Sequence, residues 1–196
     1  MARPRVREKI LDAAHRLLNQ ERTAALTTRN IALEAGTTEA SVFNNFTDKS
    51  GLFRALINER LVVVQQLVKV IEDDVMPIET WLAEVYLSAR ASYLEVMPLA
   101  ATLLKKNTDL HRILQFGPLT LNQAVAASLA RRGLFSHKGK DSTEQEADFA
   151  AIVLGTAMHG AVGEVFDRSA SISHAPNDDA RRITQMLLTL LVKTPR

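Results

Sequence analysis

The sequence predicts an all-α protein. Apolar residues recur at three- and four-residue spacing along almost the whole chain, which is the period of helices that bury one face. No segment shows the alternation of β-branched and polar residues that is typical of a half-buried strand. Of the 196 residues, 46% are hydrophobic and 23% are charged, so the chain can bury a sizeable core and its composition excludes a disordered protein.

The amino-terminal region is expected to form four helices joined by very short links. Gly36 directly follows the second helix, and because glycine enters the left-handed conformation at little cost, we expect a tight turn there. The hydroxyl of Thr38 and the carboxylate of Asp48 are placed to cap the third and fourth helices. The predicted helices span residues 5–19, 28–35, 39–46 and 49–72.

The rest of the chain is expected to contain five further helices, which gives about nine in total. Pro98 interrupts the first pattern and is expected to start a separate helix, and Gly117-Pro118 should bend or break a longer one. Thr143 and Glu146 form a capping box that is expected to start the next helix. The predicted helices span residues 77–97, 98–104, 109–131, 143–166 and 180–192, with loops at 136–141 and 169–179.

Positive charge is concentrated near the amino terminus. The net charge of the whole chain is only +2, but residues 1–60 contain ten Lys and Arg against seven Asp and Glu. An excess of basic residues on one module favours a polyanion as partner, although a solvated surface with uneven charge would give the same count.

Residues 26–52 carry the pattern of a helix-turn-helix, in which two short helices meet at a glycine turn. Since successive residues are about 100° apart around a helix, Val42 and Phe46 share one face of the second helix and are expected to pack on the core. Ser41, Asn44 and Asn45 share another face. A helix with an apolar back and a small, polar front can enter the major groove of DNA, where Asn pairs with adenine.

Residues suited to contacting DNA surround this polar front. Helix amino termini present unpaired N–H groups and a positive dipole end, which favour phosphate, and Arg and Lys add full charges. Such contacts set the register of a protein on DNA rather than read its sequence. Ala40 is small enough to meet a thymine methyl group. The expected phosphate contacts are Thr27, Thr28, Arg29, Thr37, Thr38 and Lys49.

Residues 10–56 resemble the DNA-binding region of the tetracycline-repressor (TetR) family of bacterial transcription regulators. The features of that family are a Thr-rich helix start, an Ile-Ala pair, Ala-Gly at the turn, a small residue before an aliphatic one, an aromatic cluster ending in Phe, and Lys followed by Leu. In this sequence these features are Thr27-Thr28, Ile31-Ala32, Ala35-Gly36, Ser41-Val42, Phe43 to Phe46, and Lys49 with Leu52.

This resemblance implies a domain organisation and a function. It implies a three-helix helix-turn-helix DNA-binding domain at residues 1–48 and a larger helical domain for effector binding and dimerisation at residues 49–196. It also implies a homodimer that binds a palindromic double-stranded DNA operator and represses transcription until a small apolar or amphipathic effector releases it. A transcriptional activator, or an interaction protein that keeps the fold but has lost specific DNA binding, would share these features.

Three departures from the family pattern bear on DNA binding. The family usually has Tyr where this chain has Phe43, which lacks the hydroxyl that would meet a phosphate. Asn44 and Asn45 stand where the family often has His and Tyr, so we expect this protein to read an operator of its own. Glu39 replaces a commonly basic residue. Its carboxylate would repel phosphate unless it caps its own helix, which is the interpretation we favour, or accepts a hydrogen bond from cytosine.

The last two predicted helices carry more apolar surface than one core is expected to cover. The helix from Thr143 is apolar nearly all round, and the last helix combines Leu187 and Leu190 on one face with Met186 beside it. A helix of this kind must be covered on both sides. We therefore expect these helices of two chains to form a four-helix interface, the alternative being a monomer with both helices in its interior.

An effector cavity is expected in the carboxy-terminal region, as the resemblance implies. Such cavities have mostly apolar walls and a few polar groups, although each candidate could equally belong to a plain core. The candidate lining residues are Trp81, Tyr86, Tyr93, Met97, Phe116, Gln123, Met158 and His159.

The sequence carries no motif of a catalytic or cofactor site. It has no Cys, it lacks the common nucleotide-binding, metalloprotease and nucleophile-elbow patterns, and its five His are scattered. We therefore expect no enzymatic activity, no cofactor and no metal. No apolar run reaches the roughly 18 residues of a spanning helix and no secretion signal opens the chain, so we expect a cytoplasmic protein with no membrane partner.

Overall fold

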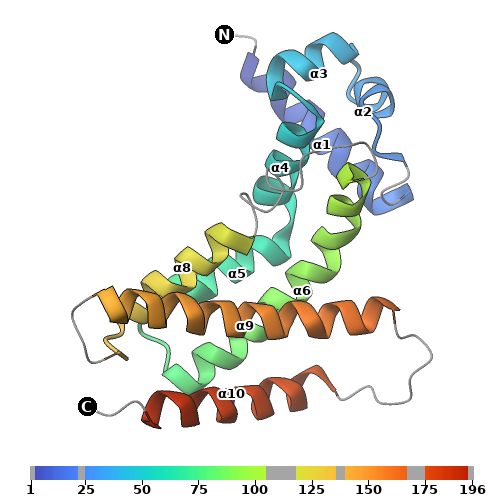
Figure 1. Ribbon diagram of the computed structural model, residues 1–196. Coiled ribbons are helices and arrows are strands. Elements are labelled where there is room, and N and C mark those ends of the chain that lie inside the picture. The colour runs from blue at the N-terminus through green and yellow to red at the C-terminus, as the bar shows by residue number, and fades with distance from the viewer. Residues whose placement is uncertain (1–2, 22–24, 105–117, 136–139, 167–174, 194–196) are drawn as a thin grey trace. The chain divides into compact units, whose positions relative to one another are not determined.

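The protein is built of helices. The computed structural model describes residues 3–21, 25–104, 118–135, 140–166 and 175–193. These segments contain nine α-helices and no strand, which confirms the predicted all-α fold (Figure 1). The helices are α1 (Arg3–Glu21), α2 (Thr28–Glu34), α3 (Glu39–Phe46), α4 (Lys49–Arg60), α5 (Val62–Glu72), α6 (Ile78–Leu104), α8 (Pro118–Arg131), α9 (Lys140–Phe166) and α10 (Pro176–Lys193).

The chain divides into two compact units. Unit 1 consists of Met1–Gln65 and Val96–Ile113, and unit 2 consists of Gln66–Glu95 and Leu114–Arg196. Helices α5 and α6 therefore each contribute residues to both units. The functional boundary expected between residues 48 and 49 stays a prediction.

Unit 1 has one continuous apolar core. Helices α1, α2, α3 and α4 each turn buried side chains into it, and Leu99 of α6 joins them. Each large apolar side chain that is fully buried contributes roughly 1.5–3 kcal/mol relative to exposure, so this cluster is the main source of the unit's stability. Its largest members are Ile10, Leu11, Leu17, Leu26, Ile31, Val42, Phe46, Leu52, Phe53, Leu56, Leu61 and Leu99.

Polar contacts at the surface of unit 1 join α1 to α4. The guanidinium of Arg7 donates two hydrogen bonds to the carboxylate of Glu59, at 2.8 and 2.5 Å. The hydrogen bond from Arg7 lowers the pKa of Glu59, and the same guanidinium lies 5.2 Å from the ring centroid of Phe46. Arg60 donates to Asp12 at 3.0 Å. Because these side chains are half-exposed, the ion pairs orient the helices more than they stabilise them.

Unit 2 is held by aromatic and aliphatic side chains from α6, α8 and α9. Trp81 is fully buried, and its indole N–H donates to the carbonyl of Val70 at 2.9 Å. The guanidinium of Arg132 lies 4.6 Å from the Trp81 ring centroid and also donates to backbone carbonyls of the loop after α5. The buried residues of this unit include Leu82, Val85, Tyr86, Ala89, Val125, Leu129, Phe149, Ala150, Val153, Leu154, Ala157 and Leu187.

The prediction of one helix over residues 49–72 is wrong. The helix ends at Arg60, and Leu61 has an extended backbone with φ −82° and ψ 109° before α5 begins at Val62. The side chain of Leu61 is buried in the core of unit 1. The helix therefore breaks at a residue whose side chain is buried. No Gly or Pro stands at this position to indicate the break in the sequence.

The predicted break at Pro98 is also wrong, because α6 runs through it to Leu104. A proline inside a helix removes one backbone hydrogen bond and leaves the carbonyl four residues earlier without its donor. Pro98 is exposed, so water can reach that side of the helix, while the neighbouring Leu99 is buried and holds the helix on the core.

The last two helices begin earlier than predicted. Helix α9 starts at Lys140 rather than at a Thr143 cap, and α10 starts at Pro176 rather than near Ala180. Proline suits the first helical position. The negative charges of Asp178 and Asp179 in the first turn are stabilised by the positive end of the helix dipole. Residues 109–117 of the predicted long helix lie outside the described part of the chain, and α8 begins at Pro118.

The link between α3 and α4 is unusually tight. Thr47 has a φ of +65°, which is rare for a β-branched residue. Gly51 lies against the end of α3, since a Cβ atom at this position would stand 2.1 Å from the carbonyl oxygen of Phe46. The carboxylate of Asp48 accepts a hydrogen bond from the Gly51 amide at 2.6 Å, which confirms the predicted cap.

Replacing Gly51 by Ala is therefore expected to push α3 away from α4. We expect the free energy of unfolding to fall by about 3 kcal/mol, the upper end of the usual range for overpacking a tight site. Urea denaturation followed by far-ultraviolet circular dichroism measures this change. The matched control is Gly36→Ala, which introduces strain of about 1 kcal/mol at a φ of +63° but meets no atom within 4 Å. A Gly51→Ala loss no larger than that of the control would contradict the tight contact.

Candidate nucleic-acid interface

Helices α2 and α3 are joined by a sharp turn at Gly36, as predicted. Gly36 has a φ of +63°. The amides of Gly36 and Thr37 donate to the carbonyls of Leu33 and Ala32, at 3.1 and 2.9 Å, so the end of α2 leaves few backbone groups unpaired. This geometry is that of a helix-turn-helix.

The back of α3 is anchored in the core of unit 1. Val42 and Phe46 are buried in the same apolar cluster as Leu17, Ile31 and Leu52, which confirms the prediction that they pack on the core. Because both anchoring side chains lie one turn apart on one face, the rotation of α3 about its axis is fixed.

The front of α3 is polar and accessible to differing degrees. Asn44 is exposed, while Ser41 and Asn45 are half-buried. The side-chain amide of Asn45 donates to the carbonyl of Ser41 at 2.8 Å, so one of its donors is already used within the helix. Asn44 therefore has the greater freedom to contact a ligand. Phe43 is 45% exposed, and Ala40 is exposed beside it.

Threonine hydroxyls cap both helices of the motif. The Thr27 hydroxyl accepts from the amide of Asn30, and the Thr38 hydroxyl accepts from the amide of Ser41, both at 3.1 Å. The predicted cap at Thr38 is confirmed. Each hydroxyl accepts through a lone pair, so its own hydrogen can still be donated to an anion.

The carboxylate of Glu39 is tied to α2, a contact that the sequence analysis missed. It accepts a hydrogen bond from the hydroxyl of Thr28 at 2.7 Å, which links the first turns of α2 and α3. The cap of α3 itself is Thr38, so Glu39 does not fill the capping role favoured from the sequence. The only signal for the contact was two polar residues at the two helix starts.

Two cations flank the motif. Arg29 is exposed on the first turn of α2. Lys49 is half-buried at the start of α4, and its ammonium group lies 5.0 Å from the ring centroid of Phe53. Thr37 is half-buried in the turn. The starts of α2, α3 and α4 thus carry capping side chains, and Arg29 and Lys49 add positive charge on the first turns of α2 and α4.

The sequence of this region matches a known family and a curated relative. Residues 10–56 match the family described as bacterial regulatory proteins, tetR family. Over 52 residues the chain is 44% identical to YvkB of Bacillus subtilis (strain 168), described as an uncharacterized HTH-type transcriptional regulator. Residues 10–56 therefore have the sequence of a TetR-family DNA-binding region. The match to YvkB spans 26% of this chain and 28% of that relative.

Solved structures share the TetR-family fold over nearly the whole chain. The TetR family repressor AlkX from Dietzia sp. strain DQ12-45-1b is 21% identical, with a TM-score of 0.57 and coverage of 96% of this chain and 98% of that one. A variant of TetR from Acinetobacter baumannii AYE, in complex with minocycline, is 16% identical, with a TM-score of 0.56 and coverage of 92% and 95%. These likenesses confirm the predicted fold.

The residues predicted to line an effector cavity differ widely in exposure. Trp81, Tyr86 and Tyr93 are buried, and burial raises the pKa of Tyr93 to about 12, so its phenol stays neutral. Met97 is half-buried, whereas Gln123, Met158 and His159 are exposed. Phe116 lies outside the described residues. The lining of an effector cavity by this set stays a prediction.

Metal-binding clusters and membrane-spanning helices are both lacking in the described part of the chain. No group of three or more His, Asp or Glu residues there is placed to hold a metal ion. Within the same residues, none of the helices has the length and apolar character needed to span a bilayer.

Proposed function

We propose that this TetR-family chain binds double-stranded DNA as a homodimer and regulates transcription, most simply as a repressor. In this proposal α3 of each copy enters the major groove at one half of a palindromic operator, with half-sites about 34 Å or a small multiple of that apart. The observation that carries the proposal is the two-sided α3, with Val42 and Phe46 buried behind and Asn44 exposed in front.

The groups around α3 support contacts to phosphate. Thr27, Thr28, Arg29, Thr37, Thr38 and Lys49 all lie at or next to the starts of α2, α3 and α4. Amino-terminal amides and positive side chains attract phosphate without regard to base sequence. In this proposal Asn44, and to a lesser degree Ser41, Asn45 and Ala40, read the bases.

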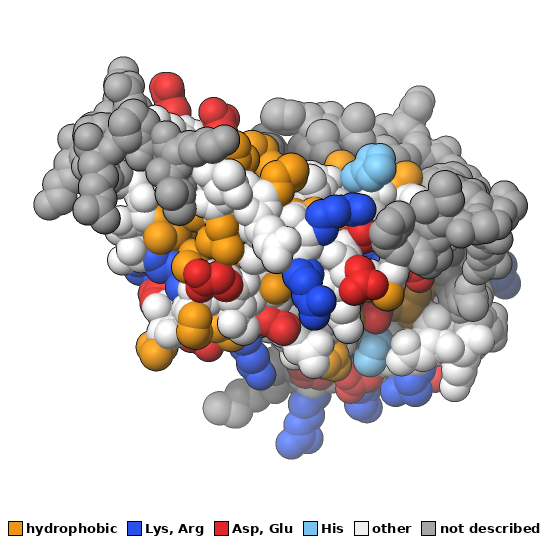
Figure 2. Space-filling view, turned by 90° about the horizontal axis from the view of Figure 1, so that it is seen from below, with side chains coloured by type: hydrophobic (Ala, Val, Ile, Leu, Met, Phe, Trp, Pro, Cys, Tyr) orange, Lys and Arg blue, Asp and Glu red, His pale blue; other side chains and the backbone are white. Residues whose placement is uncertain are grey.

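Exposed apolar side chains on the last two helices support dimerisation. Ile152 of α9 is 42% exposed and Met186 of α10 is 52% exposed. Met158 of α9 and Leu190 of α10 are exposed to a similar extent. Figure 2 views the molecule from the side on which α10 lies in Figure 1, and shows hydrophobic side chains at the surface between charged ones. Exposed Ala151 and Gly155 on α9 would let a second helix approach closely.

Release by a small apolar or amphipathic effector completes the proposal. One structural relative, the TetR variant from Acinetobacter baumannii, was solved in complex with minocycline, and another, AlkX, is described as a repressor. An effector releases DNA only if it binds more tightly to a conformer whose two α3 helices are wrongly spaced.

An interaction protein without specific DNA binding is the second candidate. Leu33 of α2 is 81% exposed, and Phe43 is exposed on α3 where a tyrosine hydroxyl would favour phosphate. Apolar groups at this surface would suit a protein partner.

Fluorescence anisotropy with labelled DNA from upstream of the chain's own gene distinguishes the two candidates. We expect a fragment containing a palindrome to bind tightly and to be displaced only by the same unlabelled sequence. If no DNA fragment binds even at low salt, the proposal is overturned in favour of the interaction protein.

Replacing Asn44 by Ala and Lys49 by Gln should separate base reading from phosphate contact. We expect Asn44→Ala to cost about 1–3 kcal/mol at the operator and to relax its sequence preference. We expect Lys49→Gln to weaken binding to all sequences. The slope of the logarithm of the binding constant against the logarithm of the salt concentration should become about one unit less steep, because one phosphate contact is lost. Anisotropy titrations on operator and scrambled DNA at several salt concentrations measure both, and identical behaviour of the two variants would refute this division.

Replacing Glu39 by Gln tests the role of the carboxylate beside the interface. Glutamine can still accept from Thr28 but carries no charge, so we expect affinity for all DNA to rise about two- to fivefold at low salt. The control is Glu72→Gln, the same charge change at the end of α5. If affinity falls instead, and only for operators with a cytosine at one position, then Glu39 reads that base.

Replacing Met186 by Glu is expected to weaken the homodimer. A charge placed in an apolar interface should reduce the free energy of dimerisation by about 2 kcal/mol or more. Sedimentation equilibrium measures the dissociation constant. The control is Gln185→Glu, which adds a charge on a neighbouring face of α10. Equal dimerisation of both variants would place the interface elsewhere.

A further inference from the structure

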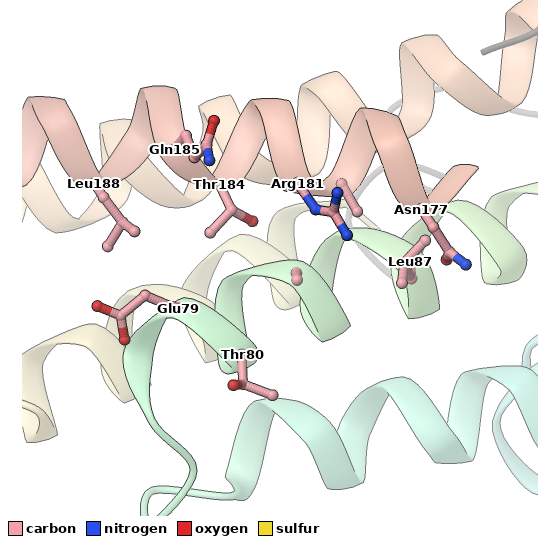
Figure 3. A pocket seen from close by; sticks show the side chains of 10 residues that line it. Glu79, Thr80, Leu87, Asn177, Arg181, Thr184, Gln185 and Leu188 are labelled. Atoms are coloured by element: carbon pink, nitrogen blue, oxygen red, sulfur yellow. The ribbon is translucent and has the colours of Figure 1, made fainter. Parts of the chain in front are cut away.

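A groove in unit 2 lies between the first turns of α6 and the length of α10. Its volume is about 440 Å³, within the usual range of small-molecule sites. Figure 3 shows the side chains of Thr184, Arg181 and Leu188 pointing from α10 toward α6. The residues predicted from the sequence to line an effector cavity do not line it. Its walls are Glu79, Thr80, Ala83, Leu87, Asn177, Ala180, Arg181, Thr184, Gln185 and Leu188.

The groove contains a buried hydroxyl that lacks a partner. Thr184 is only 6% exposed, and its Oγ1 atom makes no hydrogen bond with any described residue. A buried polar group without a partner is unfavourable, and such groups in folded proteins usually mark a missing partner. A ligand group in the groove would supply this partner.

The rest of the lining suits a molecule with an apolar body and an anionic end. The apolar members of the lining are Ala83 and Leu87 of α6 and Ala180 and Leu188 of α10. Leu87 lies toward the Asn177 end of the groove and Leu188 toward the Glu79 end (Figure 3). Asn177, Arg181 and Thr184 follow at successive turns along one face of α10 and offer hydrogen-bond donors.

The charges favour a carboxylate at the Arg181 end. Arg181 is exposed and has no ion pair with any described residue. The amino terminus of α10, which favours anions, is one turn away. The acidic neighbours do not cancel this preference, because Asp179 is paired with Arg182 at 2.8 Å and Asp178 does not line the groove. Glu79 lies toward the other end, beside Leu188 (Figure 3).

We propose that this groove is a binding site for an amphipathic monocarboxylate, whose apolar chain lies between α6 and α10 and whose carboxylate meets Arg181 and the hydroxyl of Thr184. The proposed dimer leaves the site open. Met186 is two positions from both Thr184 and Leu188, so it projects about 200° around the helix from each, on the opposite side of α10. Ligand binding in this groove does not depend on the proposed function. Only an effect of the ligand on DNA binding would rest on it.

Isothermal titration calorimetry with octanoate tests the site at pH 7.5, on the full chain and below the concentration at which octanoate forms micelles. Octan-1-ol and octylammonium, with the same chain length, report the contribution of the head group. We expect octanoate to bind more tightly than either. The fluorescence of Trp81, the only Trp and a neighbour of Thr80 on α6, gives a second readout.

Three variants locate the site. Arg181→Gln should weaken octanoate about tenfold and leave octan-1-ol unchanged. Thr184→Val should raise the melting temperature of the free protein, because it removes an unpaired hydroxyl, and should reduce the stabilisation by octanoate. Lys69→Gln is the control, because it removes one positive charge from an exposed residue of the same unit that does not line the groove, and it should leave binding unchanged. No octanoate binding, stronger binding of octylammonium, or equal binding by all variants would overturn the proposal.

A separate titration of the protein–DNA complex with octanoate keeps the two proposals distinguishable. Calorimetry requires no DNA. If the chain binds octanoate but no DNA, the proposed site stands and the proposed function is overturned. If the chain binds DNA but calorimetry detects no octanoate binding, the proposed site is overturned and the proposed function stands. Octanoate binding that leaves DNA affinity unchanged would make the groove a ligand site without an effector role.

Discussion

The buried back of α3 is the constraint on which the candidate interface depends. Val42 and Phe46 sit in the core of unit 1, and Gly51 lets α4 approach the end of α3 more closely than any other residue would. A helix of eight residues would be marginal alone, so tertiary packing decides both its presence and its rotation. The direction of Asn44 is thus a consequence of what the opposite face buries.

Hydrogen bonds within the motif then set which groups remain for a ligand. The acceptor lone pairs of Thr27 and Thr38 serve the helix amides, while their hydroxyl hydrogens are left to be donated. Thr28 differs, because its hydrogen already goes to Glu39. A phosphate that binds at this helix start, as proposed, would have to replace the Glu39 carboxylate as the acceptor from Thr28.

Local signals in the sequence predicted this region well, because each rests on a few adjacent residues. The bounds of α3, the turn at Gly36 and the caps at Thr38 and Asp48 all follow from turn chemistry and helical period. The break at Leu61 and the continuous helix through Pro98 depend on contacts distant in sequence. The unpaired Thr184 hydroxyl is likewise visible only when α6 and α10 are brought together.

Helix α10 shows why unit 2 was harder to predict. Its sequence is amphipathic, but it has three environments rather than two: Leu187 in the core, Met186 at the surface, and Thr184 in a groove. If a ligand in that groove changes DNA affinity by some factor, DNA must change ligand affinity by the same factor, since the coupling free energy is shared. A groove formed partly by α6, whose residues continue into unit 1, gives such coupling a continuous helix through which to act.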